Sequence, residues 1–338
     1  MSPVRRTPPA HPPRVPVREH RVEVLGSTTA YAEYGAADAD TTFVLVHGFR
    51  GDHHGLEPIA ARLAPRRMIV PDLPGFGESE PLAGREHDIE AYATWLRAFV
   101  EAVPLTGRFV LLGHSFGSIV VAASLAQQRS EMSAGDRRPD IVVLVNPIGA
   151  PALKGPRAVF TRLAIFYYWL ASALPESLGF GLLRNPAIVR VMSVAMAKTR
   201  DRRLRAWIHD QHDRYFSAFA NRDVVLEAFR ASVSHDVSEY AARIDEPVQL
   251  IVADRDDITP LAAQRRLRTL FPDARLHVIE NVGHLVHYEA PQEATEVILA
   301  FLDETAGGPS TTARAGSSQD AGSPHDAGSS QAGTGGKA

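Results

Sequence analysis

The 338-residue chain is predicted to fold as an α/β protein, with a mostly parallel central sheet flanked by helices. Three observations predict this class. Short unbroken apolar runs alternate with segments of helical length. One long segment, residues 147–238, contains helical runs but no good strand. One apolar run leads directly into a Gly-x-Ser-x-Gly pattern and then into a helix-like run. Such alternation is typical of a sheet with right-handed crossovers.

The predicted strands begin with an edge hairpin, because residues 21–25 alternate in polarity and residues 30–35 can pair with them. The later runs have no polar face, which suits strands covered on both sides. These runs are residues 43–46, 68–70, 109–112, 141–145 and 249–252, and a final strand is expected at 275–279. Helices are expected at 57–63, 88–103, 116–127 and 261–270.

The segment 147–238 is predicted to be a helical cap inserted before the penultimate strands. Its run 160–174 is apolar on both sides of a helix, which is typical of a helix that is buried, touches a membrane or lines an apolar pocket. The run is shorter than the ~20 residues that a membrane span needs. Ligands bind at the carboxyl edge of open α/β sheets, and an insertion of this size is expected to cover that edge.

The rest of the chain divides by composition. Residues 20–146 and 239–304 are expected to form the α/β core. Residues 1–19 are Pro-rich and lack the apolar stretch of a secretory signal, so we expect a disordered extension. Residues 305–338 are rich in Gly, Ala and Ser and are expected to be a disordered tail, because they contain too little apolar surface to bury.

Charge and cysteine content exclude several classes. The chain has 36 Lys and Arg against 39 Asp and Glu, a net charge of −3, which argues against a nucleic-acid partner. The absence of cysteine excludes disulfides, thiolate metal sites and a cysteine nucleophile, and it favours a cytoplasmic location. No cofactor is expected. Asp52, His53 and His54 do not predict a metal site, because adjacent loop residues rarely converge on one ion.

The sequence Gly113-His114-Ser115-Phe116-Gly117 predicts a nucleophile elbow, with Ser115 as the nucleophile. The chain must reverse sharply between strand and helix, and the two glycines remove side chains that would collide. The serine oxygen is then exposed at the start of a helix. There, backbone N–H groups and the helix dipole stabilise a developing anion.

Four motifs occur in one order: His47-Gly48-Phe49, Asp72-Leu73-Pro74-Gly75-Phe76-Gly77-Glu78-Ser79, the Ser115 elbow, and a late Asp followed by a His. In these motifs the chain resembles the α/β-hydrolases with a helical cap, of the esterase and lipase type, over nearly all of residues 20–304. The resemblance implies an α/β-hydrolase fold and catalysis by a Ser-His-Asp triad.

A serine hydroxyl needs a histidine base, and that base needs a carboxylate to fix its tautomer. His284 follows the strand at 275–279 and is the predicted base. The resemblance supports it, because the family's Gly-His and Glu-x-Pro occur here as Gly283-His284 and Glu289-Ala290-Pro291.

The triad carboxylate is expected in the loop after residues 249–253. The family's Asp-x-x-x-Pro matches Asp256 and Pro260, and Asp254 and Asp257 remain alternatives. Some relatives take the acid from the strand after the elbow, but that position here is Asn146. The resemblance also implies an oxyanion hole made by the backbone N–H groups of Phe49 and Phe116.

Serine at the elbow excludes the epoxide hydrolases and haloalkane dehalogenases of this fold, which use aspartate there. The leading prediction is hydrolysis of an ester, thioester or lactone of a hydrophobic small molecule. The alternatives are a C–C bond hydrolase acting on a dienoate or β-diketone, an amide hydrolase, and a ligand-binding homologue with slow turnover.

The candidate pocket residues are Phe166, Trp169, Trp207 and Phe216, although such rings also commonly pack a cap onto a core. Peripheral membrane contact through residues 160–174 is a further possibility.

Overall fold

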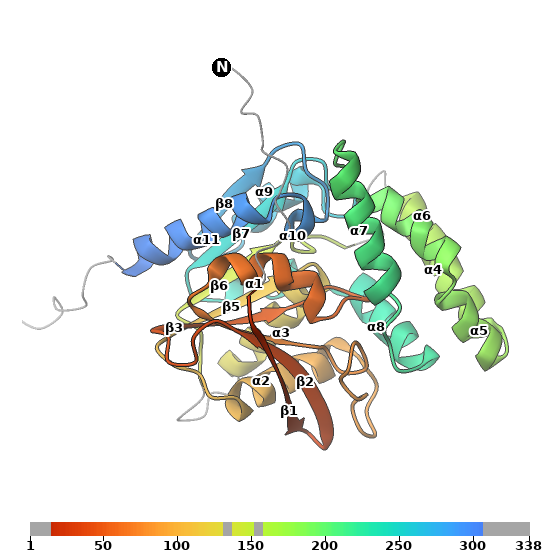
Figure 1. Ribbon diagram of the computed structural model, residues 1–338, viewed down its shortest axis with the longest axis horizontal. Helices are drawn as coiled ribbons and strands as arrows, with labels where there is room; N and C mark the ends of the chain where they lie inside the picture. The colour runs from red at the N-terminus through yellow and green to blue at the C-terminus, as the bar shows by residue number, and fades with distance from the viewer. Residues whose placement is uncertain (1–14, 131–136, 152–157, 307–338) are drawn as a thin grey trace, which may run out of the picture.

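A computed structural model describes residues 15–130, 137–151 and 158–306 of the chain. Its centre is an eight-stranded sheet in the order β1-β2-β4-β3-β5-β6-β7-β8 (Figure 1). The β1–β2 and β2–β4 pairs are antiparallel, and the other five pairs are parallel. The strands are β1 Val17–Val24, β2 Ser27–Tyr34, β3 Thr41–Val46, β4 Arg67–Pro71, β5 Arg108–His114, β6 Ile141–Val145, β7 Val248–Ala253 and β8 Ala274–Ile279. The predicted α/β class and edge hairpin are confirmed.

Helices cover both faces of this sheet. On one face α2 (Ile89–Ala102) packs against α3 (Phe116–Ser130), and on the other α1 (Glu57–Leu63) packs against α11 (Pro291–Ala306). Successive β5 side chains explain the unbroken apolar pattern of the strands. Phe109 and Leu111 belong to one buried cluster, whereas Val110 and Leu112 belong to the other. A strand buried on both faces therefore has no polar side. The shorter helices are η1 His53–Leu56, α9 Leu261–Arg268 and α10 Val286–Glu289.

Both predicted core boundaries need correction. Strand β1 begins at Val17, inside the expected extension 1–19, because residues 17–24 form a complete ladder with β2. Helix α11 continues to Ala306, and the Thr305 hydroxyl accepts a hydrogen bond from Arg108 Nη2 at 3.1 Å. The remaining parts of the two predicted tails, residues 1–14 and 307–338, lie outside the described residues.

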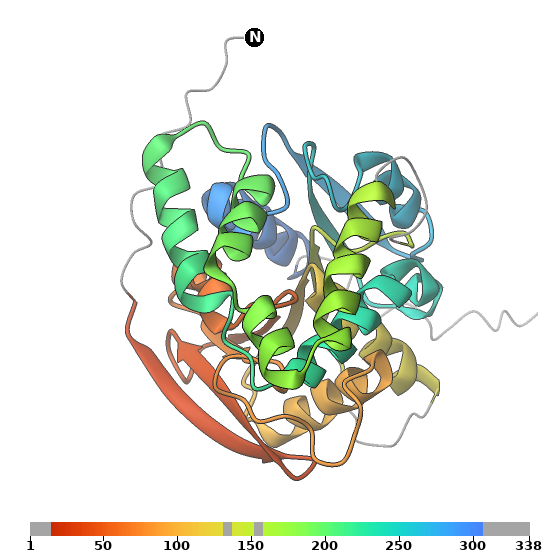
Figure 2. The ribbon, with the colours of Figure 1, turned by 90° about the vertical axis from the view of Figure 1, so that its right-hand side faces the viewer.

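Five α-helices lie between β6 and β7 in the part of the chain that the structure describes, and we call residues 158–234 the helical insert. They are α4 Ala158–Ala173, α5 Glu176–Leu183, α6 Pro186–Met196, α7 Arg202–Tyr215 and α8 Arg222–Ser234. The short helices η2 Val237–Glu239 and η3 Ala241–Arg243 lead back to the sheet. Figure 2 shows α4 to α7 in front of the sheet, where they cover the carboxyl ends of its strands.

Backbone hydrogen bonds join the insert to the core. The Ala220 N–H donates to the Gly75 carbonyl at 2.9 Å, and the Gly77 N–H donates to the Ala218 carbonyl at 2.8 Å. Gly75 and Gly77 follow β4, so the insert is fastened to a loop at the carboxyl edge. In the described ranges, none of the helices combines the length and the apolar character needed to cross a bilayer.

Candidate active site

The turn between β5 and α3 has the geometry of a strained elbow. Ser115 has φ = +53°, in the left-handed region that side chains other than glycine rarely adopt. A Cβ on Gly113 would lie 2.6 Å from the Gly117 carbonyl oxygen, and a Cβ on Gly117 would lie 2.4 Å from that of Val46. Neither position can therefore hold a larger residue without moving the backbone.

Three predicted side chains form one hydrogen-bonded chain. His284 Nε2 lies 2.7 Å from Ser115 Oγ, and His284 Nδ1 lies 2.7 Å from Asp256 Oδ2. They come from three loops at the carboxyl ends of β5, β7 and β8, separated by up to 169 residues in sequence. His284 and Asp256 are 6% and 2% exposed, so water is almost excluded from the His–Asp contact.

Asp256 is held by its own loop. Its Oδ1 accepts hydrogen bonds from the N–H groups of Ile258 and Thr259 at 2.7 and 3.1 Å, and the Thr259 hydroxyl donates to Oδ2 at 2.5 Å. Burial, the largest single influence, raises the pKa of this carboxyl. The His284 charge and the hydrogen bonds from His284 and Thr259 together outweigh burial and lower the pKa. Asp256 is therefore ionised at neutral pH.

The two alternative carboxylates lie elsewhere in the same loop. Asp254 Oδ1 accepts a hydrogen bond from the Val282 N–H at 3.3 Å, and Asp257 forms an ion pair with Lys198 at 2.6 Å. Asp257 is more than half exposed, at 55%. The structure thus brings Asp256, rather than Asp254 or Asp257, to the His284 ring.

Asn146 cannot serve as the triad acid, but its side chain holds the His284 loop. Asn146 is fully buried at the end of β6, with φ = +43°. Its Nδ2 donates to the His284 carbonyl at 2.8 Å, and its Oδ1 accepts from the Ala253 N–H at 2.9 Å. The amide therefore joins the ends of β6 and β7 to the segment that positions the histidine.

Glu289 holds the same segment from another side. Its Oε2 accepts from the Gly283 N–H at 3.0 Å, while its Oε1 accepts from the N–H groups of Lys198 and Thr199 at 2.5 and 2.8 Å. Lys198 and Thr199 lie between α6 and α7. This carboxylate therefore connects the helical insert to the residue beside His284.

Of the two predicted oxyanion donors, Phe116 follows Ser115 directly and Phe49 follows Gly48, which lies close to Ser115. Phe116 is the first residue of α3, and a helix offers no acceptor to its first N–H groups. No described residue accepts a hydrogen bond from the Phe49 N–H. The neighbouring Gly48 is so close that a Cβ on it would lie 3.1 Å from Ser115 Cβ. The Phe49 ring is enclosed by four others, with centroids 5.9 to 6.4 Å away: Phe76, Phe116, Tyr168 and Phe229.

The other histidines near the site are held neutral. Burial, and then the His284 charge, lowers the pKa of His114 to about 3. Burial, and then the charges of His114 and His284, lowers the pKa of His287 well below its usual value. His47 Nε2 accepts a hydrogen bond from the Leu73 N–H at 2.8 Å, which makes it a brace for the turn after β4. Of these residues, only His284 contacts the Ser115 hydroxyl.

The four candidate pocket residues divide into two groups. Phe216 lies under the Arg50 guanidinium, 4.8 Å from its ring centroid, and Trp207 packs edge-on against Tyr288 at 5.2 Å. Phe166 and Trp169 are instead 55% and 57% exposed on α4, with their rings 5.7 Å apart. For these two, the exposure corrects the expectation of a pocket lining, because the opposite side of α4 faces the core.

Two other features do not join this site. His53 Nδ1 is hydrogen-bonded to Asp72 Oδ1 at 2.9 Å, and the His54 ring stacks on Tyr215 at 3.9 Å. Among the described residues, no group of three His, Asp or Glu side chains is placed to hold a metal ion.

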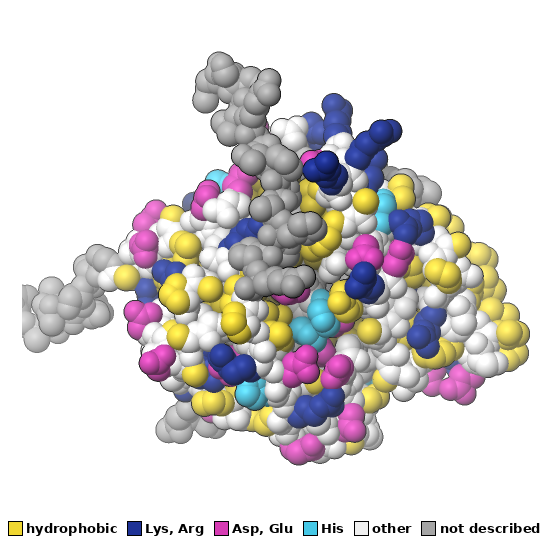
Figure 3. Space-filling model, viewed as in Figure 1, with side chains coloured by type: hydrophobic (Ala, Val, Ile, Leu, Met, Phe, Trp, Pro, Cys, Tyr) yellow, Lys and Arg dark blue, Asp and Glu magenta, His cyan; other side chains and the backbone are white. Residues whose placement is uncertain are grey.

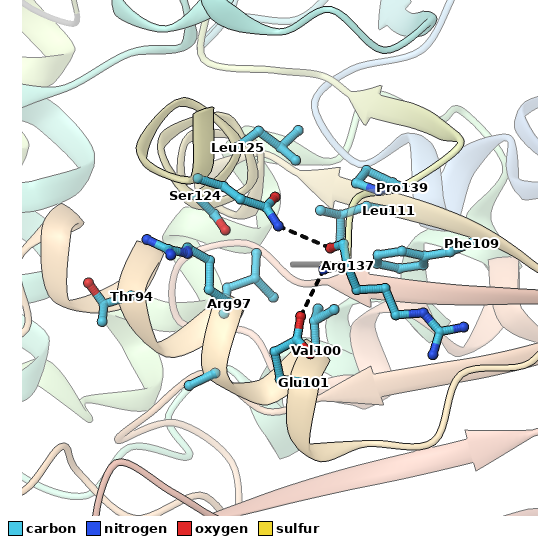
Figure 4. Close-up of a pocket in the computed structure, with 13 residues that line it drawn as sticks. Thr94, Arg97, Val100, Glu101, Phe109, Leu111, Ser124, Leu125, Arg137 and Pro139 are labelled. Atoms are coloured by element: carbon cyan, nitrogen blue, oxygen red, sulfur yellow. Dashed lines mark hydrogen bonds between the residues drawn. The ribbon is translucent and has the colours of Figure 1, made fainter. Parts of the chain in front are cut away.

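A cavity of about 300 Å³ lies between α2, α3 and the beginning of β5 (Figure 4). Its walls include Phe109 and Leu111, so it lies at the other end of β5 from Ser115.

Comparisons with known proteins agree with this fold. Lipase 1 of Psychrobacter immobilis is 24% identical over 289 residues, which cover 82% of this chain and 81% of the lipase. A 2-hydroxy-6-oxononadienedioate/2-hydroxy-6-oxononatrienedioate hydrolase of Pseudomonas putida is 25% identical, covering 77% of this chain and 87% of that protein. Among solved structures, a thermophilic esterase from Thermogutta terrifontis superposes with a TM-score of 0.67 at 24% identity, covering 85% of this chain and 99% of the esterase. The sequence model of the alpha/beta hydrolase family matches residues 43–297, and the chain belongs to that family.

Proposed function

We propose that this protein is a serine hydrolase that cleaves a carboxylic ester, thioester or lactone of a hydrophobic small molecule. The observation that carries the proposal is the continuous hydrogen-bonded chain from Ser115 through His284 to Asp256, with 2.7 Å at each step. A nucleophile, its base and the group that orients the base are the parts that acyl transfer needs.

In the first half-reaction, Ser115 Oγ attacks the acyl carbon while His284 Nε2 accepts the hydroxyl proton. The carbonyl oxygen becomes an oxyanion, which the N–H groups of Phe49 and Phe116 stabilise. His284 then donates its proton to the leaving alcohol as the tetrahedral intermediate collapses to an acyl-enzyme. Water repeats the sequence, with His284 again as base, and releases the acid and free Ser115.

Asp256 stabilises the protonated state of His284 during both half-reactions. The contact at Nδ1 fixes the tautomer in which Nε2 is free to accept the serine proton. Asp256 is buried and has a lowered pKa, so it keeps its charge at neutral pH. Asn146 and Glu289 act indirectly, because both hold the backbone that carries the imidazole.

We propose that residues 147–238 act as a cap and that Trp207 and Phe216 contribute to the substrate pocket. The cap is fastened to the core next to the oxyanion loop by Arg50, which follows Phe49. The Arg50 guanidinium is buried and donates to the Leu183 carbonyl at 2.6 Å and the Phe216 carbonyl at 3.2 Å. An apolar substrate is supported by the aromatic cluster around Phe49 and by relatives that are named lipases and esterases.

A second candidate is hydrolysis of a C–C bond in a dienoate or β-diketone. It is favoured by the similarity to the Pseudomonas putida hydrolase described above, because the same triad geometry serves that chemistry. A ligand-binding homologue with slow turnover is a third reading. A cytoplasmic location, expected from the absence of cysteine, stays a prediction.

The test is turnover of a p-nitrophenyl ester series of increasing acyl length, run beside a dienoate and with Ser115→Ala as the blank. We expect ester hydrolysis that rises with chain length to an optimum and is absent in the variant. Negligible rates on every ester with turnover of the dienoate would replace the ester proposal by the C–C proposal. If folded protein hydrolyses neither the esters nor the dienoate, the result would favour a ligand-binding homologue with slow turnover.

A further inference from the structure

The outer surface of the helical insert is unusually apolar. Of the nine large hydrophobic side chains that are most exposed in the described ranges, six lie on α4, α5 and α6. They are Leu163 at 64%, Phe166 at 55%, Trp169 at 57%, Leu178 at 61%, Val191 at 69% and Val194 at 57%. We call these six residues the apolar face. In Figure 3 yellow side chains follow the right-hand edge of the molecule, over these helices.

Packing of the insert does not account for this face. On α4, Leu163, Phe166 and Trp169 follow one another at three-residue spacing and so share one side of the helix. The buried side holds Tyr168, which is 4% exposed and stacks on Phe229 with centroids 3.8 Å apart. The helix is thus already anchored by its inner side. Contiguous exposed apolar surface rimmed by polar residues marks an interaction site.

The charge around the apolar face is opposite in sign to that of the remaining chain. Residues 158–205 contain eight Lys and Arg but two Asp and Glu, whereas all other residues contain 28 and 37. Arg200, Arg202 and Arg203 are exposed, and within the described part of the chain none of them forms an ion pair. Dark blue side chains gather over the beginning of α7 in Figure 3, beside the yellow edge.

We propose that the apolar face and the adjoining Arg200, Arg202 and Arg203 dock the protein on an anionic lipid surface. Apolar side chains enter the boundary between headgroups and acyl chains, and the arginines attract the lipid phosphates. The excess of acidic residues elsewhere is repelled by the same surface. The charge distribution therefore also orients the molecule, with the insert toward the lipid and the sheet away from it.

The same charge pattern disfavours a second copy of the chain as the occupant. In a two-fold dimer each apolar face would pack against the apolar face of the other copy. The arginines beside the two faces would then lie close together and repel one another. An anionic lipid surface combines apolar acyl chains with negatively charged headgroups. It therefore complements both the apolar face and the adjoining arginines.

The docked face is connected to the candidate active site. Helix α6, which carries Val191 and Val194, ends just before Lys198 and Thr199, whose N–H groups donate to Glu289. Glu289 in turn accepts from Gly283, the residue before His284. Docking would therefore bring a segment that is joined to the His284 loop through Glu289 toward the lipid boundary. The binding itself does not depend on the proposed ester hydrolysis and is measured without it.

The experiment uses the full chain with Ser115→Ala, so that no lipid is hydrolysed. The protein is floated with phosphatidylcholine vesicles prepared with and without phosphatidylglycerol. We expect flotation with the anionic vesicles, much weaker flotation with phosphatidylcholine alone, and loss of flotation at high salt. Tryptophan emission should shift to the blue on binding. Trp169→Phe should abolish most of that shift, because Trp95 is fully buried in the core and Trp207 is half-buried against Tyr288.

Two pairs of substitutions test the two parts of the patch. Leu163→Gln with Trp169→Gln should abolish flotation. Arg202→Gln with Arg203→Gln should lower partitioning by about fivefold for each charge removed, since one basic residue contributes roughly that factor. The matched controls are Val17→Gln, at an apolar residue 47% exposed on β1, and Arg265→Gln with Arg266→Gln on α9. Both controls should bind as the parent does.

Three results would overturn the proposal. The first is a folded parent protein that fails to float with anionic vesicles at low salt. The second is binding that the apolar-face and arginine variants retain in full. The third is a dimer in solution that Leu163→Gln with Trp169→Gln converts to monomer, which would assign the face to a second copy. Loss of ester hydrolysis with intact flotation would count against the proposed function alone.

Discussion

The triad region and the helical insert are built from the same chain under different constraints. Ser115, Asp256 and His284 follow the parallel strands β5, β7 and β8, of which β5 and β7 are buried on both faces, and hydrogen bonds hold each of the three side chains. Side chains of the insert are fixed mainly by which side of a helix meets the core. On α4, Tyr168 is buried, whereas Trp169, one position later, is 57% exposed. Positions at strand ends are thus specified by short motifs, while positions on the insert depend on long-range packing.

The largest expected effect tests the triad region at its nucleophile. Ser115→Ala removes the attacking oxygen, so kcat on the best ester should fall roughly a million-fold, the size seen when a catalytic serine is lost. The measurement is steady-state hydrolysis with thermal unfolding as a check on the fold. Ser124→Ala, two turns further along α3, is the control and should retain full activity. Substantial hydrolysis by Ser115→Ala would show that another group attacks the substrate.

The next effect concerns the carboxylate. Asp256→Asn keeps the shape of the side chain but no longer stabilises the charged His284, and kcat should fall about 10⁴-fold. The matched variants Asp254→Asn and Asp257→Asn should change kcat by less than about threefold, because neither side chain contacts the His284 ring. An equal loss in Asp257→Asn would contradict the assignment of the acid.

A smaller effect tests how the base is positioned. Asn146→Asp places a carboxylate against the His284 and Gly283 carbonyls, which lie 2.8 and 3.3 Å from Asn146 Nδ2. Repulsion should displace His284 and lower kcat roughly a hundredfold with little change in KM, as expected for a misplaced catalytic group. Asn281→Asp, at an exposed residue of the same loop, is the control. A parallel loss of activity in both variants would mean that Asn146 has no special part in positioning.

Truncations in the insert should change recognition of substrate more than catalysis. Trp207→Ala and Phe216→Ala are expected to raise KM for long-chain esters roughly five- to tenfold, because each removes apolar contact with the acyl chain. Phe166→Ala should leave kcat/KM for dissolved esters within about twofold, since its side chain is 55% exposed. A larger effect of Phe166→Ala than of Trp207→Ala and Phe216→Ala would place the pocket on the exposed side of α4, where Phe166 lies.

The smallest effect is on stability in acid. Burial, and then the His209 charge, lowers the pKa of His212 to about 4, whereas an unfolded histidine titrates near 6.5. Below pH 6.5 this histidine becomes protonated in the unfolded chain, whereas in the folded protein His212 stays neutral until the pH approaches 4. Acid therefore favours unfolding. The free energy of unfolding should fall by about 1–2 kcal/mol for this residue between pH 7 and pH 5. Denaturant titrations of wild type and His212→Gln measure this, and the variant should show a shallower decline.

The sequence predicts the sheet and the elbow because both depend on local pattern. Unbroken apolar runs identify strands buried on two faces, and the Gly-x-Ser-x-Gly pattern marks the elbow. Gly113 is required by a backbone contact within the elbow itself, whereas Gly117 is required by its approach to the Val46 carbonyl on the neighbouring strand. His284 and Asp256 follow from motifs that end late strands. The assignment of the Phe49 N–H to the oxyanion hole rests on family position and stays a prediction, since a backbone donor has no side-chain signature.

Other features depend on contacts that a linear pattern does not contain. Asn146 contacts the carbonyl of His284, 138 residues away, and the only signal was its position at the end of β6. Glu289 was noticed as part of Glu-x-Pro, but its bonds to Lys198 and Thr199 cross from core to insert. Phe166 and Trp169 were expected in a pocket because the run 160–174 is apolar on all sides. Packing of Tyr168 on Phe229 decides which side turns outward.

Labelling with a fluorophosphonate probe tests the central claim most directly, because such a probe reacts with a serine only when a base activates it. The account predicts that folded wild-type protein is labelled once, at Ser115, and that Ser115→Ala is not labelled. His284→Ala should lose nearly all of the labelling rate, while Ser124→Ala keeps it. Folded wild-type protein that remains unlabelled, or a label that maps to another serine, would contradict the Ser115–His284–Asp256 assignment.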